Sequence, residues 1–244
     1  MFSFRAFIKF LNFIFSAILL STGVGHAQRV QPLLVDLEPG GAGGRTTIIY
    51  ENTTSGTVVI EPNPRVFGTP SSQNDDTAAK EDFVVFPPSA AIEPGQTQVF
   101  RVQYVGEPNL DTSQLYALGF EQLPITPDAT ATGAALGFAV NFDVFVAVNP
   151  RDSNFNLKVN NVSVDDISGN YKVEIENTGS RYVRAGSLTW TFSNTTGQTR
   201  ELKGVALNQI MRTGDLVAPN ARVEIQVASL PDMVSEGMVI NIEP

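Results

Sequence analysis

Residues 46–60 read TTIIYENTTSGTVVI: a β-branched apolar run, a polar turn and a second β-branched run. The turn lies between Asn52 and Gly56, and Asn and Gly both tolerate the positive φ angles that tight turns need. Two such runs around such a turn are typical of a strand, a hairpin and a second strand. This stretch predicts β structure, and the rest of the chain repeats its pattern.

Short apolar runs between clusters of Gly, Pro, Asn, Asp and Thr recur along the sequence. Further strand candidates are residues 83–86, 97–105, 114–122, 137–148, 156–164, 171–177, 187–193 and 222–228. No stretch has a convincing amphipathic helix pattern. Because many short strands at near-regular spacing indicate a sandwich or a barrel, we expect an all-β fold.

A weak internal repeat bears on domain organisation. ENTTSGTV at residues 51–58 resembles ENTGSRYV at residues 176–183. The match fits a duplicated domain, and it also fits two unrelated hairpins of one β protein. Residues 149–153 (NPRDS) carry turn formers and no aliphatic side chain other than the proline, as a hinge does. We expect two β-sandwich domains in series, at residues 28–150 and 151–244.

The first 27 residues have the composition of a signal peptide. Arg5 and Lys9 supply positive charge, residues 10–20 (FLNFIFSAILL) are apolar, and residues 25–27 (GHA) precede the expected cut. An uncleaved anchor is the alternative, but a spanning helix needs roughly 20 apolar residues. We expect cleavage after Ala27, export to the periplasm and no membrane insertion of the mature chain.

The composition excludes several function classes. The net charge is −9, which opposes nucleic-acid binding. The chain has no cysteine and a single histidine, His26, inside the predicted signal peptide. Ser–His and Cys–His hydrolysis and thiolate or imidazole metal sites are therefore excluded for the mature chain. We expect a protein that is not an enzyme and that binds no metal or cofactor.

The longest strand candidate is residues 136–148, LGFAVNFDVFVAV. Its even positions are all large and apolar: Leu136, Phe138, Val140, Phe142, Val144, Val146 and Val148. Strand side chains alternate between faces, and the run would extend about 43 Å, roughly twice the usual strand of ~5–6 residues. One domain covers about half of such a strip, and the rest needs a partner. The alternative is a long strand that is buried throughout in its own sandwich.

Several segments, in order, resemble the periplasmic chaperones that assemble pili through an outer-membrane usher. They are residues 35–40 (VDLEPG), 48–52 (IIYEN), 83–95 (FVVFPPSAAIEPG), 98–102 (QVFRV), 115–125 (LYALGFEQLPI), the strip at 136–148 with Pro150, and 177–184 (NTGSRYVR). The resemblance covers about residues 30–190, and its specificity lies in the order of the motifs rather than in any one of them. It implies immunoglobulin-like domains.

The resemblance also implies a function. Family members insert their own long strand into pilus subunits that lack a last strand, a case of β-augmentation known as donor-strand complementation. Aligned backward from Pro150, the family's donor side chains fall on Leu136, Phe138 and Val140, with Phe142 next. The expected partners are pilus subunits and an outer-membrane usher. Self-association through the exposed strip is a further expectation from edge-strand physics.

One departure from the family concerns the anchor for the subunit's terminal carboxylate. Well-studied members use two basic residues, and the same alignment places Leu34 and Phe145 at those positions. Neither side chain pairs with a carboxylate. Arg101, and after it Arg29, are the candidate substitutes, and a structural ion pair is the alternative role for Arg101.

Two rival functions remain open from the sequence. A structural or adhesive surface protein of immunoglobulin-like domains would keep its long strand buried at home. A carboxylate-based hydrolase would need two acids facing each other across a cleft. The chain offers Asp143 and many loop acids, but no convincing pair.

Overall fold

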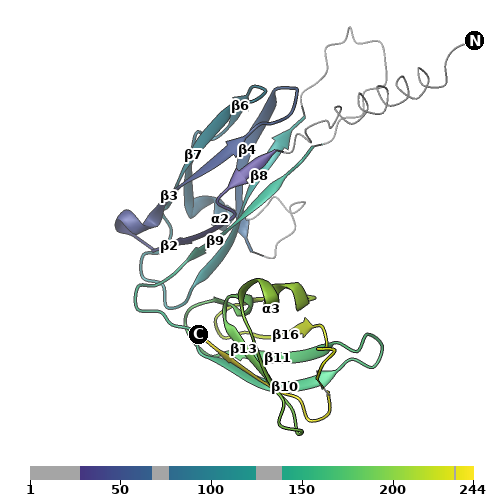
Figure 1. Ribbon diagram of the computed structural model, residues 1–244. Helices are drawn as coiled ribbons and strands as arrows, with labels where there is room; N and C mark the ends of the chain where they lie inside the picture. The colour runs from purple at the N-terminus through teal and green to yellow at the C-terminus, as the bar shows by residue number, and fades with distance from the viewer. Residues whose placement is uncertain (1–27, 68–76, 125–138, 234) are drawn as a thin grey trace, which may run out of the picture.

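The computed structural model describes residues 28–67, 77–124, 139–233 and 235–244. The predicted signal peptide at residues 1–27 lies outside these residues. The described chain forms two β units, drawn one above the other in Figure 1 and joined after residue 148. In the described ranges, no helix has both the length and the apolar character that a membrane span requires.

The first unit packs two sheets against each other. An antiparallel sheet has the order β1 (Arg29–Gln31), β3 (Arg45–Glu51), β7 (Thr97–Tyr104) and β5 (Phe83–Phe86). The second sheet has the order β2 (Leu34–Leu37), β9 (Phe142–Val148), β8 (Gln114–Leu123), β4 (Val58–Val66) and β6 (Ala90–Ile92). The N-terminal segment joins both sheets, because β1 pairs with β3 and β2 pairs in parallel with β9.

The core of this unit follows from the alternation of side chains along the strands. In β7, Phe100, Val102 and Tyr104 are buried while the residues between them face outward. The rings of Phe100 and Phe120 lie 5.1 Å apart, and Tyr50 contacts the same Phe120 ring from β3. Side chains from both sheets therefore form one apolar layer.

The second unit has a separate core around Trp190 and Phe192. One sheet consists of β10 (Leu157–Val164), β11 (Tyr171–Asn177) and β16 (Arg222–Val227). Another consists of β14 (Thr199–Leu202), β13 (Thr189–Ser193) and β17 (Val239–Glu243), and β12 (Val183–Arg184) pairs with β15 (Leu216–Val217). The all-β, two-sandwich fold predicted from the sequence is confirmed, while the predicted boundary at residue 150 stays a prediction.

Two short α-helices escaped the sequence analysis: α2 (Thr77–Glu81) and α3 (Gly204–Ile210). Single-turn 3₁₀ helices also occur at Gly41–Gly44 and Ala185–Ser187. A helix of five or seven residues makes at most about two turns, which is too short to repeat an apolar face. In α3, Leu207 is the only buried side chain. A search for helical periodicity of apolar residues therefore cannot find helices this short.

Candidate functional site

Every second side chain of strand β9 packs into the core of the first unit. Val144, Val146 and Val148 are fully buried, and Phe142 packs against the same core. The Phe142 ring meets Tyr50 edge-on, with ring centroids 5.9 Å apart. The predicted alternation along this strip is confirmed over residues 142–148.

The two edges of β9 differ. One edge pairs with β8 along the whole strand, from Phe142 to Val148. The other edge pairs with β2 only from Phe145 onward, and the Phe145 amide also donates to the Leu33 carbonyl at 3.0 Å. Among the described residues, no strand pairs with this second edge over Phe142–Val144. A short length of backbone is thus open at the edge of the sheet.

The prediction of one strand from residue 136 or 137 onward is wrong at residues 139–141, which are not strand. The ladder with β8 ends at the Phe120–Phe142 pair. Beyond it, side chains replace backbone pairing: the Gln122 amide donates to Asn141 Oδ1 at 3.0 Å and the Val140 amide donates to Gln122 Oε1. In the part of the chain that the structure describes, no strand pairs with the second edge of this segment, so no ladder holds it as a strand.

The four predicted donor side chains differ in exposure, and two of them are not described by the structure. Val140 is 44% exposed and Phe142 is half-buried. Leu136 and Phe138 lie outside the described residues. The structure therefore places Phe142 on the open edge and Val140 in the non-strand segment that leads into it.

The two positions of the expected carboxylate anchor are neighbours. Leu34 on β2 is the register partner of Phe145 on β9, at the point where the open edge ends. Phe145 points away from the core and lies between two aromatic rings. The Phe67 ring stands at 90° to it with centroids 5.1 Å apart, and the Tyr182 ring of the second unit lies 5.4 Å away.

The candidate substitutes for the anchor lie elsewhere. Arg101 is exposed on the outer face of the other sheet, where its register partners are Thr47 and Phe86. A subunit strand on β9 would have to reach around the sandwich to meet it. Arg29 forms an ion pair with Glu51 at 2.6 Å on that same sheet. Their anchor role stays a prediction.

A polar network next to the rings of Phe67, Phe145 and Tyr182 joins the two units, and no sequence motif predicted it. Asp36 Oδ1 accepts hydrogen bonds from Asn149 Nδ2 at 2.7 Å and from the Tyr182 hydroxyl at 2.9 Å. Ser113 donates to Asn149 Oδ1 at 2.6 Å and its own hydroxyl accepts the Tyr182 amide at 3.2 Å. Residues that are 146 positions apart are brought together here, and only the fold determines that.

Comparisons with known proteins agree with this architecture. Residues 43–154 match the family model described as pili and flagellar-assembly chaperone, PapD N-terminal domain. No match is found among curated proteins.

Solved structures show the same fold over most of the chain. The YadV chaperone is 13% identical with a TM-score of 0.55, over 88% of this chain and 91% of that chain. The CupB2 chaperone of Pseudomonas aeruginosa is 16% identical with a TM-score of 0.53, over 87% and 90%. A structure of the Salmonella enterica SafA pilin in complex with the SafB chaperone matches at 15% identity and a TM-score of 0.53, over 85% and 86%.

The fold is therefore that of the two-domain, immunoglobulin-like chaperones. Within it, residues 43–154 resemble the N-terminal domain of the PapD family of pili and flagellar-assembly chaperones.

Proposed function

We propose that this protein works in the periplasm, where it binds incomplete pilus subunits by donor-strand complementation and delivers them to an outer-membrane usher. The observation that supports this most is the half-paired edge of β9 at Phe142–Val144. This unpaired backbone follows directly on residues 136–141, in which large apolar side chains alternate with small or polar ones.

The chemistry of the edge suits an incomplete β-sandwich. Free backbone N–H and C=O groups on β9 pair with an added strand, while alternate side chains enter successive pockets of the client. Val140 and Phe142 have the parity of the core-facing side chains of β9. Each such side chain contributes about 1.5–3 kcal/mol when it is fully buried.

A structural or adhesive role is the competing function. It requires that the long strand be satisfied within its own sandwich. Over the described residues, β9 has two neighbours only from Phe145 to Val148. This arrangement favours a strand that another protein completes.

Delivery to an usher needs a second surface, free while a subunit occupies β9. The outer face of the other sheet offers one. It carries Val84, Phe86, Ile49 and Val99, all exposed, with Phe86 at 61%. Arg45 and Arg101 lie on the same face, and we assign this mixed apolar and basic surface to the usher.

The experiment that tests subunit binding is periplasmic co-expression with a pilus subunit of the same organism, followed by co-purification. The variant is Val140→Asp, which places a charge on the proposed edge. Val99→Asp is the matched control, because Val99 is also 44% exposed but lies on the opposite sheet. Urea unfolding of both variants checks that the domains remain folded.

Capture by the wild type and by Val99→Asp, with loss for Val140→Asp, supports donor-strand binding. Equal capture by both variants would move the interface away from β9. If the wild type captures no subunit, this result supports the structural or adhesive alternative. Self-association of the idle protein is expected through the same edge, and sedimentation of Val140→Asp should then show only the monomer.

A further inference from the structure

Two strand edges of the second domain, those of β10 and β17, border one groove, called the seam below. We infer that the seam accepts residues 139–144, called the donor edge below, from a second copy of this chain. The donor edge is that of the proposed function, on which the inference rests to this extent, but the acceptor is a new site and needs no pilus subunit. Without a subunit, the protein thus associates head to tail.

The seam lies between two strands that each have one partner. β10 is the edge of the sheet β10-β11-β16, and β17 is the edge of the sheet β14-β13-β17. Among the described residues, no strand pairs with the second edge of either β10 or β17. A cavity of about 520 Å³ lies between them, lined by residues 157–162 and 238–243. Both edges therefore border an open groove.

The floor of the seam is the core of the second domain. Ile240 of β17 is buried, and Leu157, Val159, Val162 and Ile242 are half-buried against the same core. Alternate side chains of a strand in the seam would all point toward these groups, because strand side chains alternate between faces. A strand with an apolar side chain at every second position therefore completes this core.

The donor edge has the matching pattern. Val140 and Phe142 have the parity of the core-facing side chains of β9, and Val140 is 44% exposed. The donor edge and each wall of the seam comprise six residues, a length of about 20 Å for a strand. Main-chain pairing at an exposed edge, with alternate side chains in pockets, is the mode of β-augmentation. One chain thus carries both an incompletely paired strand and a groove of the same length.

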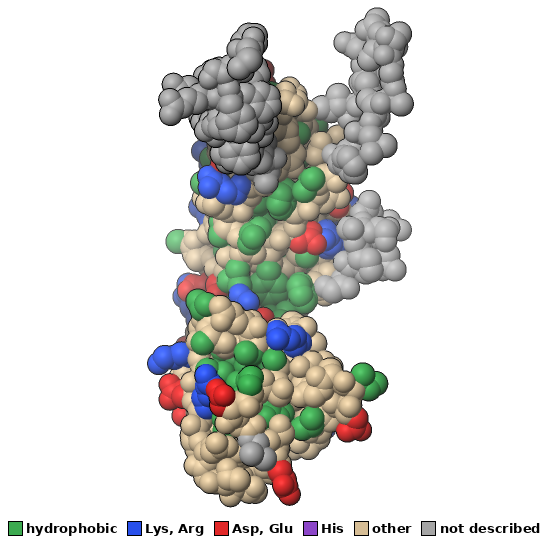
Figure 2. Space-filling view, turned by 45° about the vertical axis from the view of Figure 1, so that its right-hand side comes forward, with side chains coloured by type: hydrophobic (Ala, Val, Ile, Leu, Met, Phe, Trp, Pro, Cys, Tyr) green, Lys and Arg blue, Asp and Glu red, His purple; other side chains and the backbone are tan. Residues whose placement is uncertain are grey.

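The distribution of charge also favours this pair of surfaces. The chain has a net charge of −9, and Figure 2 shows acidic side chains on both domains. The charged residues that line the seam are Lys158 and Glu243, whose charges cancel. Asp143, the one acid of the donor edge, forms an ion pair with Arg65. Two acidic copies therefore repel each other least where these two neutral surfaces meet.

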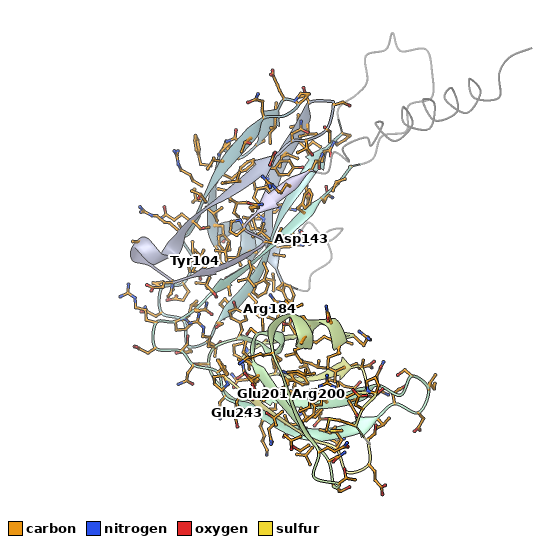
Figure 3. All side chains as sticks on the ribbon, viewed as in Figure 1. Tyr104, Asp143, Arg184, Arg200, Glu201 and Glu243 are labelled. Atoms are coloured by element: carbon orange, nitrogen blue, oxygen red, sulfur yellow. The ribbon has the colours of Figure 1, made fainter. Side chains whose placement is uncertain are left out.

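Within one molecule the donor edge does not reach its own seam. Figure 3 shows Asp143 of β9 in the first domain and Glu243 of β17 in the second, well separated from each other. β9 is also held in its sheet by β8 from Phe142 to Val148. The occupant of the seam therefore comes from another molecule. Because the two surfaces differ, the contact is heterologous and leaves a free donor edge at one end of the dimer and a free seam at the other.

Cysteine cross-linking tests this contact, because the chain has no cysteine of its own. Protein with Asn141→Cys is mixed with protein with Asn241→Cys, without any pilus subunit, and treated with a short bifunctional maleimide. Both asparagines are exposed and alternate with core-facing side chains. In the control mixture, Val205→Cys takes the place of Asn241→Cys, since Val205 is 75% exposed and lies on α3, away from the seam.

We expect at least about tenfold more cross-linked dimer from the test mixture than from the control mixture, because a specific contact raises the local concentration of the two thiols. Val140→Asp, added to the Asn141→Cys protein, should lower that yield by about tenfold, since it places a charge in an apolar groove. A change from about 50 to 500 mM NaCl should raise the yield, because salt screens the repulsion between acidic copies.

Equal yields in the test and control mixtures would overturn the seam. A dimer from Asn141→Cys alone, at the yield of the test mixture, would also overturn it, because that product shows edge-to-edge pairing of β9. If the wild type captures a pilus subunit but the test mixture gives no specific cross-link, the proposed function stands and only the seam fails. If the cross-link forms and is lost with Val140→Asp while no subunit is captured, the seam stands and the chaperone function fails.

Discussion

Arg65 on β4 forms an ion pair with Asp143 on β9, two strands away. The strand between them, β8, carries Gly119 opposite Asp143, and a side chain there would lie 2.6 Å from Arg65 Nη1. The guanidinium thus crosses β8 where it has no side chain. Because Asp143 belongs to the half-paired part of β9, this contact gives the open edge a second attachment.

Gly119→Ala is therefore expected to displace the guanidinium and loosen the start of β9. Overpacking of a filled site costs about 1–3 kcal/mol, which urea unfolding measures. Hydrogen exchange should speed up at Phe142–Val144 before it does at Val146. Gly56→Ala is the matched control, because its new methyl group meets nothing within 4 Å. Equal effects of the two changes would show that the crossing arginine does not hold the edge.

The second prediction concerns a pair of buried asparagines in equivalent turns. Asn52 Nδ2 donates to the carbonyls of Gly56 and Ile92, both at 2.8 Å. Asn177 Nδ2 donates to the carbonyl of Arg181 at 2.8 Å and approaches that of Val217 at 3.4 Å. Both asparagines are fully buried. The acceptors lie 4 and 40 residues further along the chain in each case.

Replacing either asparagine by Ala removes these hydrogen bonds, of which those to the carbonyls of Ile92 and Val217 are buried, and a buried polar group that loses its partner costs about 1–3 kcal/mol. We expect Asn52→Ala and Asn177→Ala each to lower the free energy of unfolding by about 2–4 kcal/mol. Asn194→Ala is the control, since this half-buried residue makes a similar turn in which its Oδ1 accepts the Thr196 amide in a hydrogen bond that is exposed to solvent. Its loss should cost below about 1 kcal/mol. Similar destabilisation by all three would contradict the special role of the buried pair.

These turns also show which features of the fold could be predicted from the sequence. The likeness of residues 51–58 and 176–183 left a duplication and a coincidence equally open, and the shared hydrogen bonds favour two equivalent sandwich domains. The alternation of Val144, Val146 and Val148 predicted which face is buried, because strand periodicity is a local property. The end of the ladder at Phe142 was not predictable, because it depends on where β2 and β8 run.

The domain junction was beyond the sequence for a related reason. Tyr182 and Asp36 have no local signature, and their contact exists only because two domains meet. Arg65 lies in EPNPRV, whose prolines and charges suggest exposure, yet the residue is only 5% exposed. The ion pair between Arg65 and Asp143 forms across Gly119 of the strand between them. Its position follows from the register of the three strands, which a single sequence does not specify.

The third prediction is an alkaline limit of stability. Burial raises the pKa of Tyr50 to about 12. Burial and the hydrogen bond to Asp82 raise the pKa of Tyr116, and burial and the hydrogen bond to Asp36 raise that of Tyr182. A group with a raised folded pKa stabilises fully below its unfolded pKa, about 10 for tyrosine, and this contribution is lost as the pH rises through the folded value.

The free energy of unfolding should therefore fall steeply above pH 10, by about 1.4 kcal/mol per pH unit for each such tyrosine. The described residues contain no histidine and the chain no cysteine, so little change is expected between about pH 6 and 9. Midpoints of urea unfolding at pH 7, 9, 10 and 11 measure stability in the flat range and in the alkaline range. Tyr50→Phe should make the alkaline slope shallower, and an unchanged slope would argue against its burial.

The last prediction concerns Asp36, which holds the two domains at their junction. Its Oδ1 accepts two hydrogen bonds, one from Asn149 in the first domain and one from Tyr182 in the second. Hydrogen bonds to a charged group contribute about 1.5–3 kcal/mol each, but the core of each domain is built without them. Asp36→Ala should thus leave the unfolding of each domain nearly unchanged while it broadens the distribution of angles between them.

Small-angle scattering and a fluorescence pair across the junction measure that distribution. Glu38→Gln is the control, because its exposed partner Arg151 lies on the linker at 2.9 Å and such surface pairs contribute below about 1 kcal/mol. Because the rings of Phe145 and Tyr182 lie 5.4 Å apart across the junction, their contact should loosen together with that angle. A variant that keeps the wild-type distribution of angles would show that the aromatic contacts set the junction without Asp36.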